Sequence, residues 1–313
     1  MKKIGDLIQN QIGAINKRGN FEETVKDILA FPPIKAFVDQ HQDDLNQEMI
    51  SQSISKFNEY KREYLAYEKG QGMANPGFKP ELFINHSYID VRYHPTEEYY
   101  QMKEKRHKES LLSNRTMSRD VRQAQLNDFY TNSTSRQALL IAVTQFMESF
   151  VKDPYSSQGL YIYGPFGVGK TFILGAMANH LVDKGYSVNM VHWPTFAIEV
   201  KQSIGTSRTQ EMVDQLKKTN ILIVDDIGAE PNTPWIRDEI FNSILEYRMK
   251  EYLPTFFTSN FSMSELEHHL TYSRDGGHES IKAQRIMERI KFLSKEIILE
   301  GESLRKQGHY IKE

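Results

Sequence analysis

The chain has 313 residues, of which 39% are hydrophobic and none is cysteine. This length predicts about two domains with substantial cores, and the lack of cysteine excludes disulfides, thiolate catalysis and cysteine-ligated metal centres. The 39 Lys and Arg residues nearly balance the 41 Asp and Glu residues, so any basic nucleic-acid site must be local. The start lacks a signal-peptide apolar core and no apolar run has the length of a membrane helix, so we expect a cytoplasmic protein without a membrane association.

Residues 1–100 are expected to form a small, mainly helical amino-terminal domain with a short β-hairpin. Pro32 and Pro33 interrupt its helical pattern early. Strand-like runs on both sides of residues 85–87 predict the hairpin. A helix before it is predicted from residues at three- and four-residue spacing, which share one face: Ile50, Ile54, Phe57, Tyr60, Tyr64 and Tyr67. This face serves either the core of the domain or a partner protein.

Residues 101–132 are expected to form a basic linker or an exposed helix. Lys and Arg outnumber Asp and Glu between residues 102 and 122. A charge run of this size is typical of a solvated surface and is also compatible with nucleic-acid contact.

Residues 133–313 are expected to form a second domain, in which helical patterns alternate with short β-branched runs. The predicted strands cover residues 160–163, 187–191, 221–224, 255–258 and 297–299. Such alternation predicts a parallel sheet covered by helices on both faces, an α/β fold of three α/β/α layers.

The segment between the first of these strands and the next helix satisfies the phosphate-loop pattern G-x-x-x-x-G-K-[ST]. Glycines allow backbone N–H groups to turn inward around phosphate oxygens at a helix amino terminus. Lys170 supplies a cation at the β- and γ-phosphates, and Thr171 offers a hydroxyl to Mg²⁺. The predicted nucleotide-binding residues are Gly164, Pro165, Phe166, Gly167, Val168, Gly169, Lys170 and Thr171.

Two further strands bring polar side chains to the carboxyl edge of the predicted sheet, where ligands bind in open α/β folds. Asp225 and Asp226 follow the strand at 221–224, and Asn260 follows the strand at 255–258. We expect Asp225 to hold Mg²⁺ and Asp226 to polarise the attacking water. Asn260 either orients that water or serves only in the turn.

Arginines follow in the last part of the chain. Arg285 and Arg289 lie four residues apart on one face of a predicted helix, and Arg305 comes after the last predicted strand. A planar, permanently charged guanidinium suits the charge that develops during phosphoryl transfer. The alternative is an exposed basic helix.

This combination of phosphate loop, Asp-Asp strand, Thr-Ser-Asn strand end and arginines resembles the AAA+ P-loop NTPases. Within them it is most similar to the bacterial replicative helicase loaders of the DnaI/DnaC type, most narrowly over residues 221–230 and 301–305. The resemblance implies a slow, switch-like ATPase that uses ATP and Mg²⁺ and self-associates through this domain. It also implies that Arg285 is an arginine finger toward a neighbouring subunit's ATP, with Arg289 supporting that interface, and that Arg305 is a second sensor.

The resemblance further implies two macromolecular partners. The amino-terminal domain would bind the hexameric replicative DNA helicase, and residues 194–220 would contact single-stranded DNA, with Lys201 and Arg208 as candidates. The chain departs from the family in its lack of the cysteines that commonly build an amino-terminal zinc-binding fold, so residues 69–95 must be held by packing or by another metal site. Asp226 also stands where AAA+ proteins more often have a longer Glu, which fits a slow switch.

The leading interpretation is an ATP-dependent loader that delivers the replicative helicase onto single-stranded DNA during initiation or restart of replication. One alternative is a transposition-targeting AAA+ ATPase. Another is a nucleotide-switch adaptor that never hydrolyses ATP, which would need Lys170 and Asp225 but not Asp226.

Overall fold

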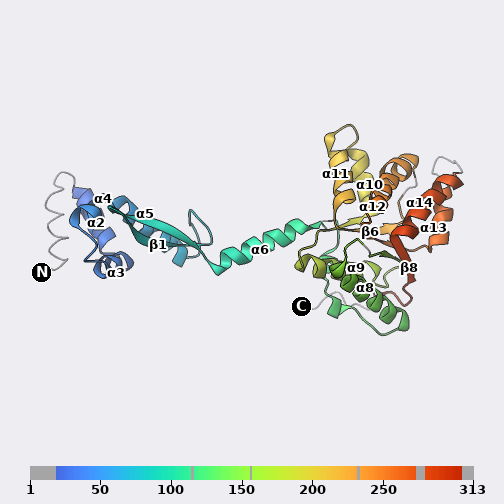
Figure 1. Cartoon of the computed structure of the whole chain (residues 1–313), viewed down its shortest axis with the longest axis horizontal. Helices are drawn as coiled ribbons and strands as arrows, with labels where there is room; N and C mark the ends of the chain where they lie inside the picture. Colours follow the sequence, from blue (N-terminus) through green and yellow to red (C-terminus); the bar gives the residue numbers. More distant parts are fainter. Residues whose placement is uncertain (1–18, 114–115, 156, 231–232, 273–278, 305–313) are drawn as a thin grey trace. The chain divides into compact units, whose positions relative to one another are not determined.

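The computed structural model describes residues 19–113, 116–155, 157–230, 233–272 and 279–304. The chain divides into two compact units, Met1–Arg106 and His107–Glu313, and Figure 1 labels many of their elements. Within the described ranges no helix combines the length and the apolar character needed to cross a membrane.

The first unit combines short helices with an antiparallel hairpin. Its elements are α2 (Gly19–Leu29), α3 (Pro32–Gln40), α4 (Gln47–Gln52), α5 (Ile54–Glu68), β1 (Phe78–Asn85) and β2 (Tyr88–Pro95). The predicted hairpin is confirmed: Asn85 pairs with Tyr88, and His86 in the turn has a φ of 49°. That left-handed conformation is one that His adopts more readily than bulky apolar residues do.

The helix predicted across residues 50–67 is divided at Ser53, where α4 ends and α5 begins. The buried Ser53 hydroxyl donates to the Met49 carbonyl at 2.7 Å and accepts from the Ile89 N–H of β2 at 2.7 Å. Ser53 thereby joins both helices to the hairpin. The core of this unit contains Val25, Ile28, Leu29, Ile34, Val38, Ile50, Phe57, Tyr60, Leu82 and Ile89. Residues of the predicted apolar face thus lie in the unit's own core, together with side chains of the hairpin.

The second unit is built on a parallel sheet, as the sequence predicts. Its strands are β3 (Leu112–Ser113), β4 (Gly159–Tyr163), β5 (Val188–His192), β6 (Ile221–Ile227), β7 (Thr255–Ser259) and β8 (Ser294–Ile298). Their order across the sheet is β3-β5-β6-β7-β4-β8.

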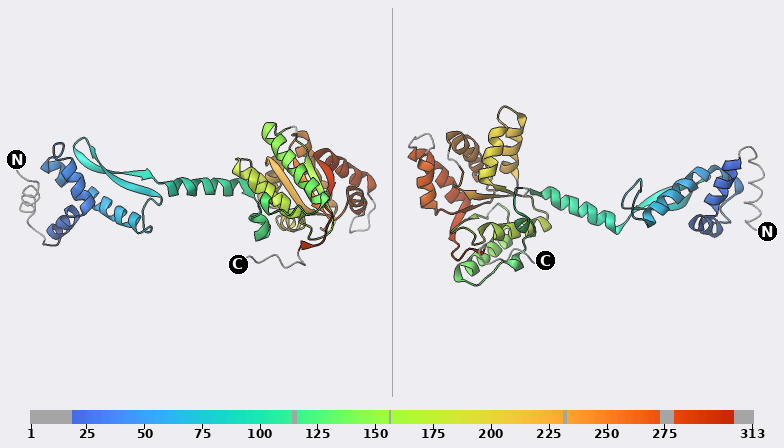
Figure 2. Two further views of the ribbon diagram at one scale, coloured as in Figure 1. Left: turned by 90° about the horizontal axis from the view of Figure 1, so that it is seen from below. Right: turned by 180° about the vertical axis from the view of Figure 1, so that it is seen from behind.

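Helices cover both faces of this sheet, which gives the expected three layers (Figure 2). One face packs against α7 (Arg119–Arg122), α8 (Thr134–Lys152) and α9 (Lys170–Asp183). The other packs against α10 (Trp193–Gln202), α11 (Ser207–Lys218), the π-helix η2 (Trp235–Phe241), α12 (Asn242–Lys250), α13 (Met263–Thr271) and α14 (Ser280–Leu293).

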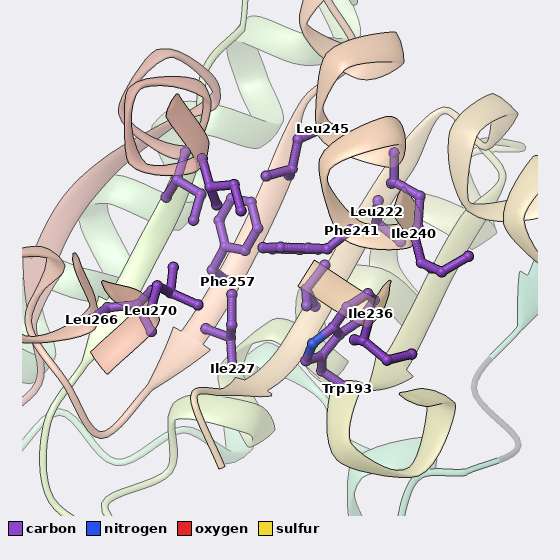
Figure 3. Packing of buried hydrophobic residues seen from close by; sticks show 14 of the residues in the cluster. Trp193, Leu222, Ile227, Ile236, Ile240, Phe241, Leu245, Phe257, Leu266 and Leu270 are labelled. Atoms are coloured by element: carbon purple, nitrogen blue, oxygen red, sulfur yellow. The ribbon is translucent and has the colours of Figure 1, made fainter. Parts of the chain in front are cut away.

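Strand β6 illustrates why a continuous apolar run is needed in the middle of the sheet. Ile221 and Ile223 enter the cluster on the α8 and α9 side, whereas Leu222 and Val224 enter the opposite cluster. Figure 3 shows part of the cluster that contains Leu222 and Val224, in which Trp193 packs against Phe241. Because neighbouring strand residues point to opposite faces, both sets must be apolar when both faces are covered.

Strand β8 differs from its prediction. It covers Ser294–Ile298 rather than residues 297–299, and it lies at the edge of the sheet beside β4. Lys295 and Glu296 are exposed there. Charged residues are characteristic of edge strands, and they hide such strands from a search for apolar runs.

Residues 101–132, expected to be a basic linker, contain several short elements. They form the end of α6 (Glu97–Leu111), then β3, α7 and the 3-10 turn η1 (Leu126–Asp128). Helix α6 buries no residue. Leu112, however, pairs with Val188 of β5, and the buried Val121 of α7 contacts Gly175 of α9 so closely that an added Cβ would lie 2.6 Å from its side chain. These apolar residues attach the second half of the segment to the second unit.

Candidate nucleotide-binding site

The phosphate loop connects β4 to α9, where the motif predicts it. Gly169 is the N-cap of α9 and has a φ of 100°, which favours glycine. Gly167 has a φ of 78°, and a Cβ on it would lie 2.3 Å from the Ser303 hydroxyl. The Leu304 N–H also donates to the Gly167 carbonyl at 3.0 Å. The segment after β8 therefore packs on the loop, whereas Arg305, the predicted second sensor, lies outside the described residues.

The apolar side chains of the loop have different surroundings. Val168 is fully buried, and Phe166 is 71% exposed. The buried Val168 anchors the loop in the cluster beneath α9. Phe166 is left on the surface.

Lys170 is buried and directed into the site. Its Nζ donates to the Gly164 carbonyl at 2.7 Å, to the Pro165 carbonyl at 2.9 Å and to Asn260 Oδ1 at 2.8 Å. Asn260 follows β7, so the structure brings together the loop and the strand end that the sequence predicts at this edge. The ammonium group is thus fixed beside the loop carbonyls.

Thr171 and Asp225 lie together, as expected of a shared magnesium site. Thr171 Oγ1 donates to Asp225 Oδ1 at 2.7 Å, and Thr258 Oγ1 donates to the same oxygen at 2.7 Å. Burial raises the pKa of Asp225, and the hydrogen bonds from the two threonines lower it. A hydroxyl and a carboxylate are hard oxygen donors, the type that Mg²⁺ prefers, so this donor set fits that ion.

Asp226 is placed beside Asp225 by an irregularity in β6. The ladder between β6 and β7 shifts register between Val224 and Ile227, and Asp226 has a φ of 60°. Neighbouring residues of a regular strand point to opposite faces, whereas a bulge redirects a side chain. Both carboxylates therefore reach polar partners at the carboxyl edge, and β6 extends past the aspartates instead of ending before them.

The Asp226 carboxylate has a partner on each oxygen. Asn260 Nδ2 donates to Oδ1 at 3.1 Å, and His192 Nε2 lies 3.7 Å from Oδ2. The imidazole lowers the pKa of Asp226, and Asp226 raises the pKa of His192. The Asp226 carboxylate is therefore held in its charged form.

Of these partners, Thr258 belongs to the Thr-Ser-Asn strand end seen in the sequence, although no role is predicted for it there, and His192 is not predicted at all. The Thr258 hydroxyl also accepts from the Asp226 N–H at 2.9 Å. His192 ends β5 and precedes the helix α10, where its Nδ1 lies 2.8 Å from Thr195 Oγ1. The signal that was available is a polar residue at the carboxyl end of the strand beside β6.

Glu230 is a further buried acid close to this edge. Its Oε2 accepts from the Gly228 N–H at 2.8 Å. Burial is the largest cause that raises its pKa to about 7; the charge of Asp226 adds to the rise, and hydrogen bonds from N–H groups oppose it. Glu230 therefore titrates near neutral pH.

The other predicted residues lie away from the loop in this chain. Arg285 is exposed on α14, while Arg289 bonds Asn242 and lies 3.5 Å from Glu246 of α12. Lys201 and Arg208 are exposed on α10 and α11, on either side of the connection between these helices. The structure does not bring these four residues to the phosphate loop.

Comparisons with known proteins support the resemblance over both units. Residues 1–93 match the family model "Primosomal protein DnaI N-terminus", and residues 85–310 match "IstB-like ATP binding protein". The replicative helicase loader DnaI of Bacillus subtilis (strain 168) is 35% identical over 310 residues, which cover 97% of this chain and 99% of that protein.

Solved structures agree for the second unit. A crystal structure of DnaI has a TM-score of 0.54 and 42% identity, and covers 61% of this chain and 98% of its own. A primosome component of Streptococcus pyogenes serotype M3 has a TM-score of 0.53 and 36% identity, and covers 63% of this chain and 97% of its own. The chain therefore belongs to the DnaI family of replicative helicase loaders, with an IstB-like ATP-binding domain.

Proposed function

We propose that this chain binds the replicative DNA helicase and, in an ATP-dependent step, delivers it onto single-stranded DNA. The observation that carries the proposal is the convergence of Lys170, Thr171, Asp225 and Asp226 at one sheet edge, in a chain similar to a helicase loader along 97% of its length. The amino-terminal match to the DnaI family favours a loader over a transposition-targeting ATPase.

Each residue of the site has its own role in ATP hydrolysis. The loop N–H groups and Lys170 hold the phosphates, since the loop opens at the amino terminus of α9. Thr171 and Asp225 hold Mg²⁺, which when bound neutralises phosphate charge. Asp226 accepts a proton from the attacking water, and Asn260 orients Asp226 through the bond between their side chains.

The exposed charged residues serve contacts between molecules. Arg285 reaches the ATP of a neighbouring copy as an arginine finger, which requires self-association through the second unit. Lys201 and Arg208 contact the phosphates of single-stranded DNA from the α10 and α11 side. Arg305 acts as the second sensor, after the segment that packs on the loop.

A loading assay tests the proposal. The purified chain is mixed with the replicative helicase of its own organism and a circular single-stranded DNA carrying an annealed labelled strand, and strand release is measured with ATP, ADP or no nucleotide. We expect release to depend on the chain and on ATP. Lys170→Ala removes the loop cation and is expected to abolish the stimulation, whereas Lys184→Ala, at an exposed position after α9, leaves it unchanged.

Further measurements separate the parts of the proposal. Lys201→Ala with Arg208→Ala should weaken binding of fluorescent single-stranded DNA and reduce its salt dependence, while helicase capture persists. Phosphate release by the wild-type chain distinguishes an ATPase from an adaptor that only binds ATP. Helicase loading at the same rate with Lys170→Ala would contradict the role of nucleotide.

A further inference from the structure

A buried arginine lies directly behind the phosphate loop. Arg136, in the first turn of α8, is 3% exposed. Its Nη2 donates to the Val168 carbonyl, and its Nη1 donates to the Tyr130 carbonyl at 3.3 Å. A Cβ added to Gly169 would lie 3.9 Å from both terminal nitrogens. The guanidinium therefore borders the loop immediately before Lys170.

The charge of Arg136 has no acidic partner in the part of the chain that the structure describes. Its guanidinium lies 5.2 Å from the Phe129 ring, and its two hydrogen bonds go to carbonyls. Burial lowers the pKa of Arg136, and no carboxylate there raises it. Burying a cation without a counter-charge is unfavourable by several kcal/mol.

Arg248 shows what a purely structural buried arginine looks like in this fold. It is fully buried at the opposite edge of the sheet, where β7 begins. Its five N–H groups have many acceptors: the carbonyls of Leu216, Lys217, Thr219, Asn220 and Pro254, and the Thr255 hydroxyl. Among the described residues Arg136 donates to two carbonyls, and it borders the loop proposed to bind phosphate.

We propose that Arg136 is a positioning residue of the nucleotide site: it fixes the loop through the Val168 carbonyl, and its buried charge is balanced by the polyphosphate of the bound nucleotide. This inference rests on the nucleotide binding proposed above. Attraction between charges is strong where water is excluded and grows with the charge of the ligand. ATP therefore gains more from Arg136 than ADP does.

Binding of ATP and ADP to Arg136→Met, Arg136→Lys and Arg248→Met tests the inference in the full-length chain. Isothermal titration should show ATP affinity about tenfold lower or more in Arg136→Met, with a smaller loss for ADP. Arg136→Lys keeps the charge without the planar fork and should recover part of the ATP affinity. Arg248→Met should lower the unfolding temperature yet leave both affinities unchanged while folded.

Unfolding temperatures measured without and with ATP distinguish a role of the Arg136 charge in nucleotide binding from a role in packing alone. Arg136→Met should lower the unfolding temperature less than Arg248→Met, and ATP should raise it less than in the wild type. Equal losses of ATP and ADP affinity, without recovery in Arg136→Lys, would overturn the electrostatic role. If Arg136→Met does not fold, the ATP and ADP affinities of Arg136→Gln are compared with those of Arg136→Lys instead. Wild-type protein that binds neither nucleotide would contradict the proposed function itself, whereas wild-type affinity in every Arg136 variant would contradict only this inference.

Discussion

His192 and Asp226 face each other from neighbouring parallel strands, with Nε2 of the imidazole 3.7 Å from Oδ2 of the carboxylate. His192 is thus next to one oxygen of Asp226, while Asn260 donates to the other. The pKa of His192 is raised above 6.5 and that of Asp226 is lowered below 3.8 because each stabilises the charged form of the other.

This pair predicts a pH-dependent contribution to stability. Because the pKa of His192 is raised, its stabilisation of the folded state is fully present below pH 6.5 and is lost as pH rises through the folded pKa. Because the pKa of Asp226 is lowered, its stabilisation of the folded state is present above pH 3.8 and is lost as pH falls through the folded pKa. His192→Asn should therefore reduce the free energy of unfolding by about 0.5 kcal/mol at pH 6 and by less at pH 9, since both side chains are one-third exposed. Urea unfolding at the two pH values measures this, and an equal loss at both would contradict the ion pair.

The two aspartates should have separable roles. Asp226→Asn should keep ATP affinity and lower the rate of phosphate release by about 10²-fold or more, because the amide cannot accept a proton from water. Asp225→Asn should instead raise the Mg²⁺ concentration needed for half-maximal turnover, because a ligand charge is lost. Titrating Mg²⁺ in a steady-state ATPase assay distinguishes them. The division of roles is wrong if both variants change the same parameter.

Arg285→Ala tests the proposed action of this arginine on the ATP of a neighbouring subunit. Because Arg285 is exposed on α14 and is proposed to reach the ATP of a neighbouring copy, the variant should bind ATP normally and hydrolyse it poorly. Mixing it with Lys170→Ala protein should restore part of the rate, since an intact loop can then meet an intact arginine. Light scattering confirms association at the concentrations used. No recovery in associated mixtures would mean that Arg285 does not act in trans.

Glu230 should make the chain less stable as pH rises toward neutrality. Its pKa is raised from 4.5 to about 7 by burial, so the folded state holds a proton that the unfolded state releases between these values. This group therefore lowers the free energy of unfolding by up to about 3 kcal/mol across that interval. Glu230→Gln should remove this fall and be the more stable protein at pH 8. Chemical unfolding at pH 4.5 and 8 checks it; a wild-type and variant difference that stays constant with pH would contradict it.

The sequence predicts best where local pattern and tertiary role coincide. The apolar run at 221–224 is buried on both faces, so its strand is visible without a structure. The phosphate loop can be recognised in the sequence because its backbone conformation requires glycine, as the φ of 100° at Gly169 shows. The break at Ser53 is not visible, because its reason is a hydrogen bond to Ile89, far along the chain.

The parts of the site that the sequence does not predict are those that depend on contacts between residues far apart in the chain. Asp226 reaches its partners through a bulge against β7, and no property of the Asp-Asp pair reveals that register shift. His192 contacts the Asp-Asp pair and Arg136 contacts the phosphate loop, each from another element of the fold. A single His or Arg in a sequence is compatible with many roles, so neither contact can be predicted. The π-helix after β6 is also not predicted, because such helices are rare.

The order of strands across the sheet determines when the phosphate loop can become ordered during synthesis. Strand β4, which leads into the loop, pairs only with late strands: Tyr161 lies beside Phe257 on one side and Glu296 on the other. The hairpin of the first unit, by contrast, pairs Asn85 with Tyr88. Contacts between distant residues form slowly because a long loop must close first. As the chain leaves the ribosome, the two strands of the hairpin can therefore pair early, whereas β4 can pair with both of its neighbours only after β7 and β8 have been synthesised.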